Sequence, residues 1–161
     1  MNLYLASEFD GHGGRLLSLA LAAEDGKHWY ASYPGSTWAA DLWVQEHVLP
    51  VIEAMPRTIP ETTPEDFRLA LREYLLARSG ATIWADWPDD FAHLMRLMSG
   101  PSYAESFMIP CTMQLIVTPE GEPKPEIPHN ALSDAIALMR WHQQTKALDE
   151  LSAVSQELGL E

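Results

Sequence analysis

The sequence predicts an α/β domain with a mixed five-stranded sheet flanked by helices, and two observations predict this class. The first part of the chain holds three β-type runs joined by glycine-containing turns, which indicates an antiparallel meander. The rest of the chain alternates helical periodicity with two further β-type runs, an order typical of α/β folds. Because 161 residues suffice for one hydrophobic core, we expect a single domain over residues 1–161.

The strands are expected in five β-type runs, at residues 3–7, 16–22, 27–33, 81–85 and 111–118. The glycine-rich stretch 10–14 lies between the first two runs and is typical of a hairpin connection. Asp25 and Gly26 mark a second tight turn, which leads into the third run. The first three strands are therefore expected to pair as consecutive antiparallel neighbours.

Helices are expected in four segments, at residues 41–54, 64–78, 89–98 and from 130 to a stop at Gly159. In the first segment Leu42, Gln45, Leu49 and Ile52 fall at helical spacing. Pro50 lies inside this segment and predicts a kink or an early break, because proline cannot donate the helical hydrogen bond.

The second and third helices begin with recognisable signals. Thr63 has the position of an N-cap, and Pro64 follows at the first helical position. The third helix follows a turn at residues 86–88 and carries one apolar stripe, made of Phe91, Leu94, Met95 and Met98. Residues of this kind at this spacing predict burial in the core.

The charge of the chain limits the partners that it can bind. Against 23 Asp and Glu there are only 10 Lys and Arg, so the formal net charge is −13. Such a charge repels polyanions at long range, which argues against a broad duplex-binding surface. A nucleic acid can still enter a small site where divalent cations neutralise the carboxylates.

The compartment is predicted from cysteine usage and hydropathy. Cys111 is the single cysteine, which excludes an intramolecular disulfide and a thiolate metal cluster. No apolar stretch approaches the roughly 20 residues that cross a bilayer. We therefore expect a cytoplasmic protein that makes no membrane contact.

Candidate catalytic side chains lie at the ends of predicted elements. Glu8 ends the first strand, Asp89 and Asp90 begin the third helix, and Asp134 lies one turn inside the last helix, just after His129. Hydrolysis of a phosphodiester needs an activated water and compensation of charge on the leaving oxygen. Two divalent metals held by carboxylates supply both, and a histidine nearby can act as general base.

This pattern resembles the DEDDh group of 3′ to 5′ exonucleases, which have a ribonuclease H-like fold. The first motif of that group, Asp-x-Glu, corresponds to residues 6–8 (ASE), and the second, an Asp at a helix start, to Asp90. The third motif, His-x-x-x-x-Asp, corresponds to residues 129–134 (HNALSD) and is the most specific of the three. The likeness is to the small stand-alone bacterial exoribonucleases of the group and covers about residues 2–142.

The resemblance implies a role for each matched residue. Glu8, Asp90 and Asp134 would bind two divalent metal ions, Mg²⁺ or Mn²⁺, and His129 would be the general base. Phe9 would stack on the terminal base of the substrate. The resemblance also implies that the substrate is the 3′ end of single-stranded RNA or of a short oligonucleotide, and that the protein is a homodimer.

Two assignments near the second motif stay open. Asp89 is the alternative to Asp90, although the spacing from residues 83–86 and the following Phe91 favour Asp90. Asp86 either supports a metal ligand or caps the helix.

The chain departs from the family pattern at Ala6, because a methyl group cannot coordinate a metal ion. This departure predicts an inactive form, either an active enzyme disabled on purpose or a natural relative that has lost activity. The alternative function is a non-catalytic module of the same fold that binds nucleotides or a protein partner. A third is an assembly protein whose tryptophan-rich surface makes a homodimer and whose acids are incidental.

Overall fold

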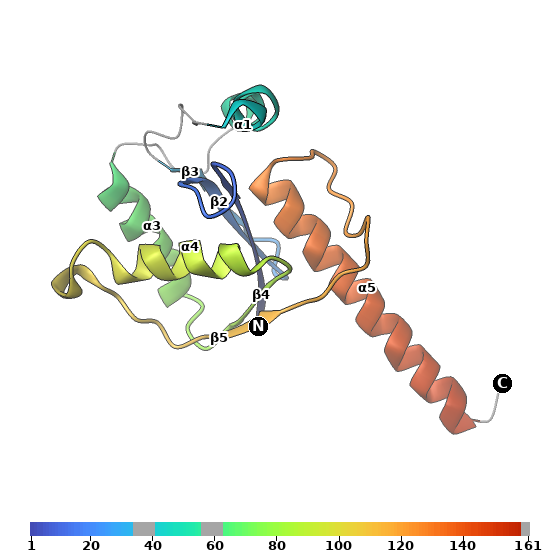
Figure 1. The fold of residues 1–161 in the computed structure, drawn as a ribbon. Helices are drawn as coiled ribbons and strands as arrows, with labels where there is room; N and C mark the ends of the chain where they lie inside the picture. Colours follow the sequence, from blue (N-terminus) through green and yellow to red (C-terminus); the bar gives the residue numbers. More distant parts are fainter. Residues whose placement is uncertain (34–40, 56–62, 159–161) are drawn as a thin grey trace.

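The fold is α/β, as predicted, with a mixed five-stranded sheet flanked by helices in an arrangement consistent with a ribonuclease H-like fold (Figure 1). The computed structural model describes residues 1–33, 41–55 and 63–158. The elements in chain order are β1 (Asn2–Phe9), β2 (Leu16–Ala23), β3 (Trp29–Ser32), α1 (Leu42–His47), α2 (Leu49–Ala54), α3 (Pro64–Leu76), β4 (Thr82–Ala85), α4 (Pro88–Ser99), the 3-10 helix η1 (Tyr103–Glu105), β5 (Thr112–Leu115) and α5 (Ala131–Leu158).

The sheet has the order β3-β2-β1-β4-β5, so β1 lies at its centre. The strand pairs β1–β2 and β2–β3 are antiparallel, which confirms the predicted meander. The pairs β1–β4 and β4–β5 are parallel, with Tyr4 opposite Trp84 in the first of them. Because β1 and β4 run in the same direction, their carboxyl ends meet at one edge of the sheet.

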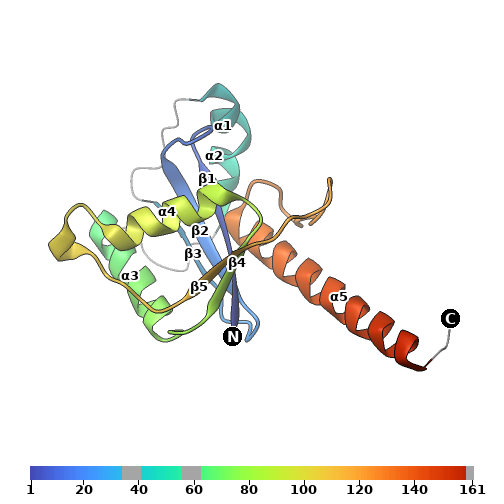
Figure 2. The ribbon, with the colours of Figure 1, turned by 60° about the horizontal axis from the view of Figure 1, so that its bottom comes forward.

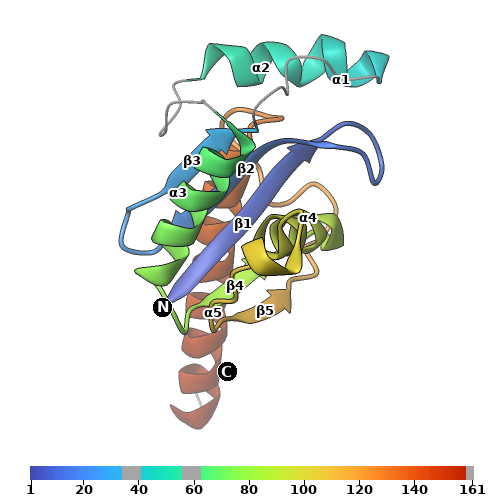
Figure 3. The same cartoon turned by 90° about the vertical axis from the view of Figure 1, so that its left-hand side faces the viewer.

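Side chains of β1 alternate between two helical layers, as the period of a strand requires. Leu3 and Leu5 pack on the face that α3 and α4 cover. Tyr4 and Ala6 pack on the opposite face, against the first half of α5. Figure 3 shows the two layers, with α3 and α4 in front of the sheet and α5 behind it.

The predicted helix over residues 41–54 is two helices, α1 and α2, which meet at Val48. Pro50 lies in the first turn of α2, where its missing N–H costs no hydrogen bond. Val44 and Val48 are buried while Leu42 is 74% exposed, because Leu42 and Val44 are two residues apart on α1 and so face opposite sides of that helix. The four residues that fall at helical spacing do lie in these helices. They do not share one buried face, because Leu49 and Ile52 are buried while Leu42 and Gln45 are exposed.

The start of α3 agrees with its predicted signals, because the Thr63 hydroxyl accepts a hydrogen bond from the Asp66 amide at 3.1 Å. In α4 the predicted stripe is only partly buried. Leu94 and Met98 are in the core with Leu97, whereas Met95 is 38% exposed, so the prediction for Met95 was wrong. The cause is that positions 94, 97 and 98 already cover the face of α4 that meets the sheet.

The two halves of the long helix α5 lie in different environments. Ala131, Ala135 and Leu138 in its first half are buried against the sheet. Its second half extends beyond the rest of the molecule, as two views show (Figures 1 and 2). The predicted stop at Gly159 lies outside the described residues. A search of the described helices found none long and apolar enough to cross a membrane.

The hairpin between β1 and β2 provides a first test of the fold. A side chain at Gly14 would place its Cβ 1.7 Å from the carbonyl oxygen of Asp10, whereas a Cβ at Gly13 meets nothing within 4 Å. We expect Gly14→Ala to lower the free energy of unfolding by about 3 kcal/mol or more, because backbone must move to admit the methyl group.

Gly13→Ala is the matched control in the same turn. Its φ of 68° strains an L-residue, so a loss of about 1 kcal/mol is expected. Urea denaturation of the two variants measures both values. Equal losses would show that the described hairpin conformation is wrong.

Candidate active site

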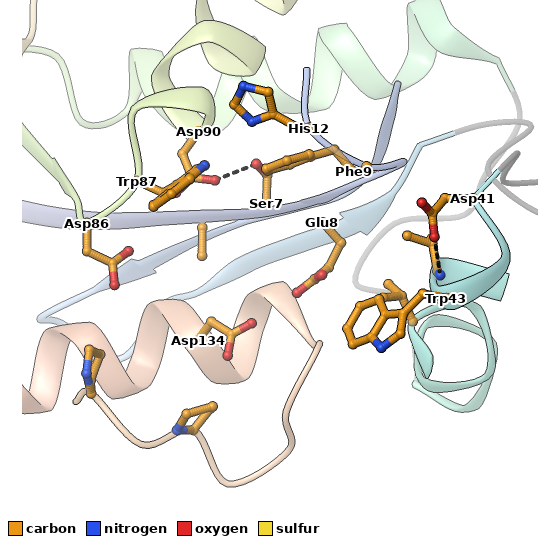
Figure 4. Close-up of a pocket in the computed structure, with 16 residues that line it drawn as sticks. Ser7, Glu8, Phe9, His12, Asp41, Trp43, Asp86, Trp87, Asp90 and Asp134 are labelled. Carbon is orange, nitrogen blue, oxygen red and sulfur yellow. Dashed lines mark hydrogen bonds between the residues drawn. The ribbon is translucent and has the colours of Figure 1, made fainter. Parts of the chain in front are cut away.

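A pocket of about 620 Å³ lies where the carboxyl ends of β1 and β4 meet the first turns of α1, α4 and α5. Its acidic lining residues are Glu8, Asp41, Asp86, Asp90 and Asp134. No Lys or Arg is among the lining residues that the structure describes. We call this the carboxylate pocket (Figure 4).

The topology explains why acids from distant segments converge there. Glu8 is near the end of β1, and Asp86 follows β4 directly, so the parallel pairing brings them to the same edge. Asp90 is in the first turn of α4, and Asp134 is in the first turn of α5. Carboxylates are favoured at helix N-termini because the helix dipole is positive there.

Consecutive residues of β1 serve opposite sides of the pocket. The Ser7 hydroxyl donates a hydrogen bond of 2.5 Å to Oδ1 of Asp90, on the side of α4. Glu8 points to the other side and hydrogen-bonds Asp134 on α5. Figure 4 shows the two sets of side chains above and below β1. The arrangement of side chains in the pocket thus depends on how side-chain direction alternates along one strand, β1.

Burial and crowding raise the pKa values of these carboxyls. Burial first, and then the hydrogen bond with Asp134, raises the pKa of Glu8. Burial raises the pKa of Asp134 too. For Asp90, burial raises the pKa to about 7, although the bond from Ser7 acts in the opposite direction. Burial also raises the pKa of Asp86. The group therefore needs protons or cations to balance its charge.

The chemistry of these donors fits a hard divalent cation, because Mg²⁺ and Mn²⁺ prefer carboxylate oxygens. Their positions provide no complete cage: across residues 1–33, 41–55 and 63–158 no three His, Cys, Asp or Glu side chains form a group that could hold a metal ion. Ala6 contributes a methyl group to the pocket wall, on the same face of β1 as Tyr4 and α5. An acid at position 6 would add a donor on that wall.

His129 does not line the carboxylate pocket. It precedes α5 with a φ of 61°, in the left-handed region, and the next residue, Asn130, caps the helix by accepting a hydrogen bond from the Ser133 amide at 3.0 Å. Its ring meets the ring of Trp43 edge-on, with 5.0 Å between the centroids. His129 therefore contacts one residue of the pocket wall without lining the pocket itself.

The structure distinguishes Asp90 and Phe9, which line the pocket, from Asp89, which does not. Asp90 lines the pocket, whereas Asp89 does not and lies 3.7 Å from the exposed His12 ring. Phe9 lines the pocket and packs on the ring of His93, with 5.1 Å between the centroids.

Sequence analysis did not identify Asp41 as a candidate site residue, and it gave Asp86 only a supporting role. Asp41 caps α1 through the Val44 amide and comes from a segment that the motifs do not reach. Asp86 was expected only to support a ligand or cap a helix, yet its carboxylate faces the pocket (Figure 4). Its place directly after a strand, at the edge where sites of α/β sheets lie, is the signal that could have found it.

Comparison with known proteins identifies two distant relatives of this chain. No family model matches the chain. A 3′-5′ exoribonuclease of Mycobacterium tuberculosis strain CDC 1551 / Oshkosh is 29% identical over 163 residues, which span 93% of this chain and 96% of that protein. The 3′-5′ exoribonuclease of strain H37Rv matches with the same values. These distant relatives support a nuclease.

The buried carboxyls predict an unusual pH dependence of stability. The pKa of Asp90 rises from 3.8 to about 7 on folding, so the folded protein binds more protons than the unfolded chain between these values. Without divalent cations, the free energy of unfolding should therefore fall as the pH rises from about 4 to about 7. Asp90→Asn should make this decline shallower in urea titrations.

Asp149→Asn is the control, because Asp149 is exposed on the projecting half of α5. It should leave the pH dependence unchanged. A decline equally steep in the Asp90→Asn and Asp149→Asn proteins would contradict the role of the buried carboxyl.

Proposed function

We propose that this chain is a metal-dependent 3′-5′ exoribonuclease of the DEDDh type, whose activity Ala6 limits or abolishes. The observation that carries the proposal is the convergence of Glu8, Asp90 and Asp134, from three separate elements, on one pocket that no Lys or Arg of the described residues lines. The relationship to the mycobacterial exoribonucleases supports hydrolysis of RNA.

In this proposal Glu8, Asp90 and Asp134 hold two divalent ions, Mg²⁺ or Mn²⁺. When bound, such ions lower the pKa of a water molecule and neutralise charge on the leaving oxygen. Ser7 orients Asp90 through its hydrogen bond. Phe9 would offer an aromatic face to the terminal nucleobase. His129 would be the general base for the attacking water, which requires its ring to move from its contact with Trp43 into the pocket.

The substrate class follows from the charge of the protein. A surface with a net charge of −13 repels long polyanions, so a single-stranded 3′ end or a short oligonucleotide is the favoured substrate. The ions compensate the acids locally, which lets a phosphate enter the pocket.

The test restores the acid that the family pattern has at position 6. The Ala6→Asp protein with Mn²⁺ should shorten a single-stranded RNA stepwise from its 3′ end, because the added carboxylate completes the donor set. Asp134→Ala in the same background should remove the activity, whereas Asp149→Ala should not. Gel analysis of 5′-labelled RNA follows the products. Absence of shortening in the Ala6→Asp protein would refute the nuclease.

A second candidate is a non-catalytic module that binds nucleotides or a protein partner. Ala6 and the lack of a ready metal group in the described residues favour it. The same experiment separates the two functions: this candidate predicts RNA or partner binding that persists in EDTA, together with no gain of activity in Ala6→Asp.

We also propose a homodimer, formed through the projecting half of α5. Leu148, Leu151 and Val154 are 66%, 67% and 52% exposed and follow one another at intervals of three, which places them along one side of the helix. If two such helices packed together, each would shield these side chains of the other from solvent.

The proposed dimer contact predicts how one substitution on α5 changes dissociation of the dimer. Leu151→Glu should raise the dissociation constant at least about tenfold, because it puts a charge in the centre of an apolar contact. The control Ala153→Glu adds the same charge two residues on, about 200° around the helix. Light scattering during size exclusion measures both. A monomeric parent protein, or an unchanged dimer in Leu151→Glu, would refute the interface.

A further inference from the structure

Two serine hydroxyls are buried in the sheet without a hydrogen-bond partner. Ser18 is in the first half of β2 and Ser32 ends β3, and both residues are 0% exposed. The Oγ atom of each has no partner among the residues that the structure describes. A buried hydroxyl without a hydrogen bond costs free energy on folding, so two of them side by side need an explanation.

The two serines lie in one row with Glu8. In the antiparallel pair of β1 and β2, Ser18 is opposite Glu8, and in the pair of β2 and β3 it is opposite Ser32. Residues directly opposite each other point to the same face of a sheet, with Cβ atoms about 4.5–5.5 Å apart. The row therefore crosses three strands, and Ser18 is the member next to Glu8.

The face of the sheet that carries this row is the one that α5 covers. Ala20 and Tyr30, each two residues from one of the serines, pack on that face against the first half of α5. Glu8 points to Asp134 of the same helix (Figure 4). Ser18 does not line the carboxylate pocket, so it can act on the pocket only through Glu8.

A bulge fixes the position of Ser18 on β2. The register of β1 and β2 shifts between Glu8 and Phe9, so that Leu16 is opposite Phe9 and Leu17 is the extra residue. Leu17 is buried in a separate cluster with side chains of α1 and α2. Because a slip by one residue would expose Leu17 and turn Ser18 to the other face, the packing of Leu17 holds Ser18 opposite Glu8.

The other side of the pocket shows what a hydroxyl can do for a carboxylate there. Ser7 donates a hydrogen bond of 2.5 Å to Oδ1 of Asp90. The hydrogen-bond partner of Glu8 is instead a second carboxyl, that of Asp134. Carboxylates that bind a cation together accept hydrogen bonds but donate none, so Glu8 would lose this partner and need a donor from elsewhere.

We propose that Ser18 is a positioning residue for Glu8, and that its hydroxyl donates a hydrogen bond to the Glu8 carboxylate when this carboxylate binds a divalent cation. The inference rests on the proposed nuclease and adds a residue that the sequence motifs do not include. Ser18 would orient Glu8 on the α5 face of the sheet as Ser7 orients Asp90 on the α4 face. Metal-binding carboxylates are commonly held by such outer partners.

This role gives the metal-free and the metal-bound protein opposite requirements. Without metal the Ser18 hydroxyl is buried and unpaired, which destabilises the fold. With metal the same hydroxyl has a charged acceptor. A serine with a purely structural role would be hydrogen-bonded in the metal-free protein. Removal of the hydroxyl therefore separates the two roles, because it acts differently on stability and on metal affinity.

The experiment uses the full chain with Ala6→Asp, in which the proposed donor set is complete. Ser18→Ala should weaken Mn²⁺ binding about tenfold or more in isothermal titration calorimetry, because an outer partner of a metal ligand is lost. Without metal, the same variant should unfold at a urea concentration no lower than that of its parent, because a hydrogen replaces a hydroxyl that had no partner.

Ser32→Ala is the matched control, because it removes an equally buried and unpaired hydroxyl from the same row. Ser32 is two strands from Glu8, and neighbouring strands lie about 4.8 Å apart. Its Mn²⁺ affinity should equal that of the parent. Ser18→Ala that binds Mn²⁺ as tightly as Ser32→Ala, or that loses stability without metal, would overturn the proposal.

A double-mutant cycle tests whether Ser18 acts through Glu8. In the Glu8→Ala protein the acceptor of the proposed hydrogen bond is gone. Adding Ser18→Ala should then change the remaining Mn²⁺ affinity by no more than about twofold, because the effects of two residues in contact are not additive. An equal loss of affinity with and without Glu8 would show that Ser18 does not position it.

The outcomes for Ser18 and for the nuclease are separable. If the Ala6→Asp protein shortens RNA while Ser18→Ala and Ser32→Ala bind Mn²⁺ alike, the nuclease holds and the role of Ser18 is refuted. If Ala6→Asp shortens no RNA but its Mn²⁺ affinity depends on Ser18, the nuclease is refuted and the role of Ser18 holds. An Ala6→Asp protein that binds no Mn²⁺ would refute both.

Discussion

The constraint on which the site depends is the burial of several like charges at one end of the parallel pair β1–β4. Glu8, Asp86, Asp90 and Asp134 share a pocket that no Lys or Arg of the described residues lines, and burial raises the pKa of each. A core that only had to be stable would avoid such a group, because desolvated charges without partners are costly. Clusters of perturbed carboxyls are instead typical of sites that handle cations or protons.

The central strand, β1, determines where the side chains of this pocket lie. Neighbouring side chains of β1 point to opposite faces, so Ser7 reaches α4 while Glu8 reaches α5. One strand thus ties together the two helices that carry Asp90 and Asp134. Ala6 packs on the α5 face, and its methyl group forms part of the wall of the carboxylate pocket.

Charge separation is the second organising feature. Acids line the carboxylate pocket, whereas Arg15, Arg68 and Arg96 line a separate hollow on the side of the sheet that α3 and α4 cover. The β1–β2 hairpin and the contact of Phe9 with His93 join these regions.

Local patterns determined the order of elements, the sheet class and the Thr63 cap, because hairpin turns, caps and periodicity act over a few residues. They also named Glu8, Asp90 and Asp134, which the structure brings to one pocket. Only the tertiary structure decided that Asp86 joins them, that His129 contacts Trp43 instead of lining the pocket, and that arginines distant in sequence gather on the α3–α4 face. Those facts depend on strand register and on how helices cross the sheet, and residues far apart in the chain set both.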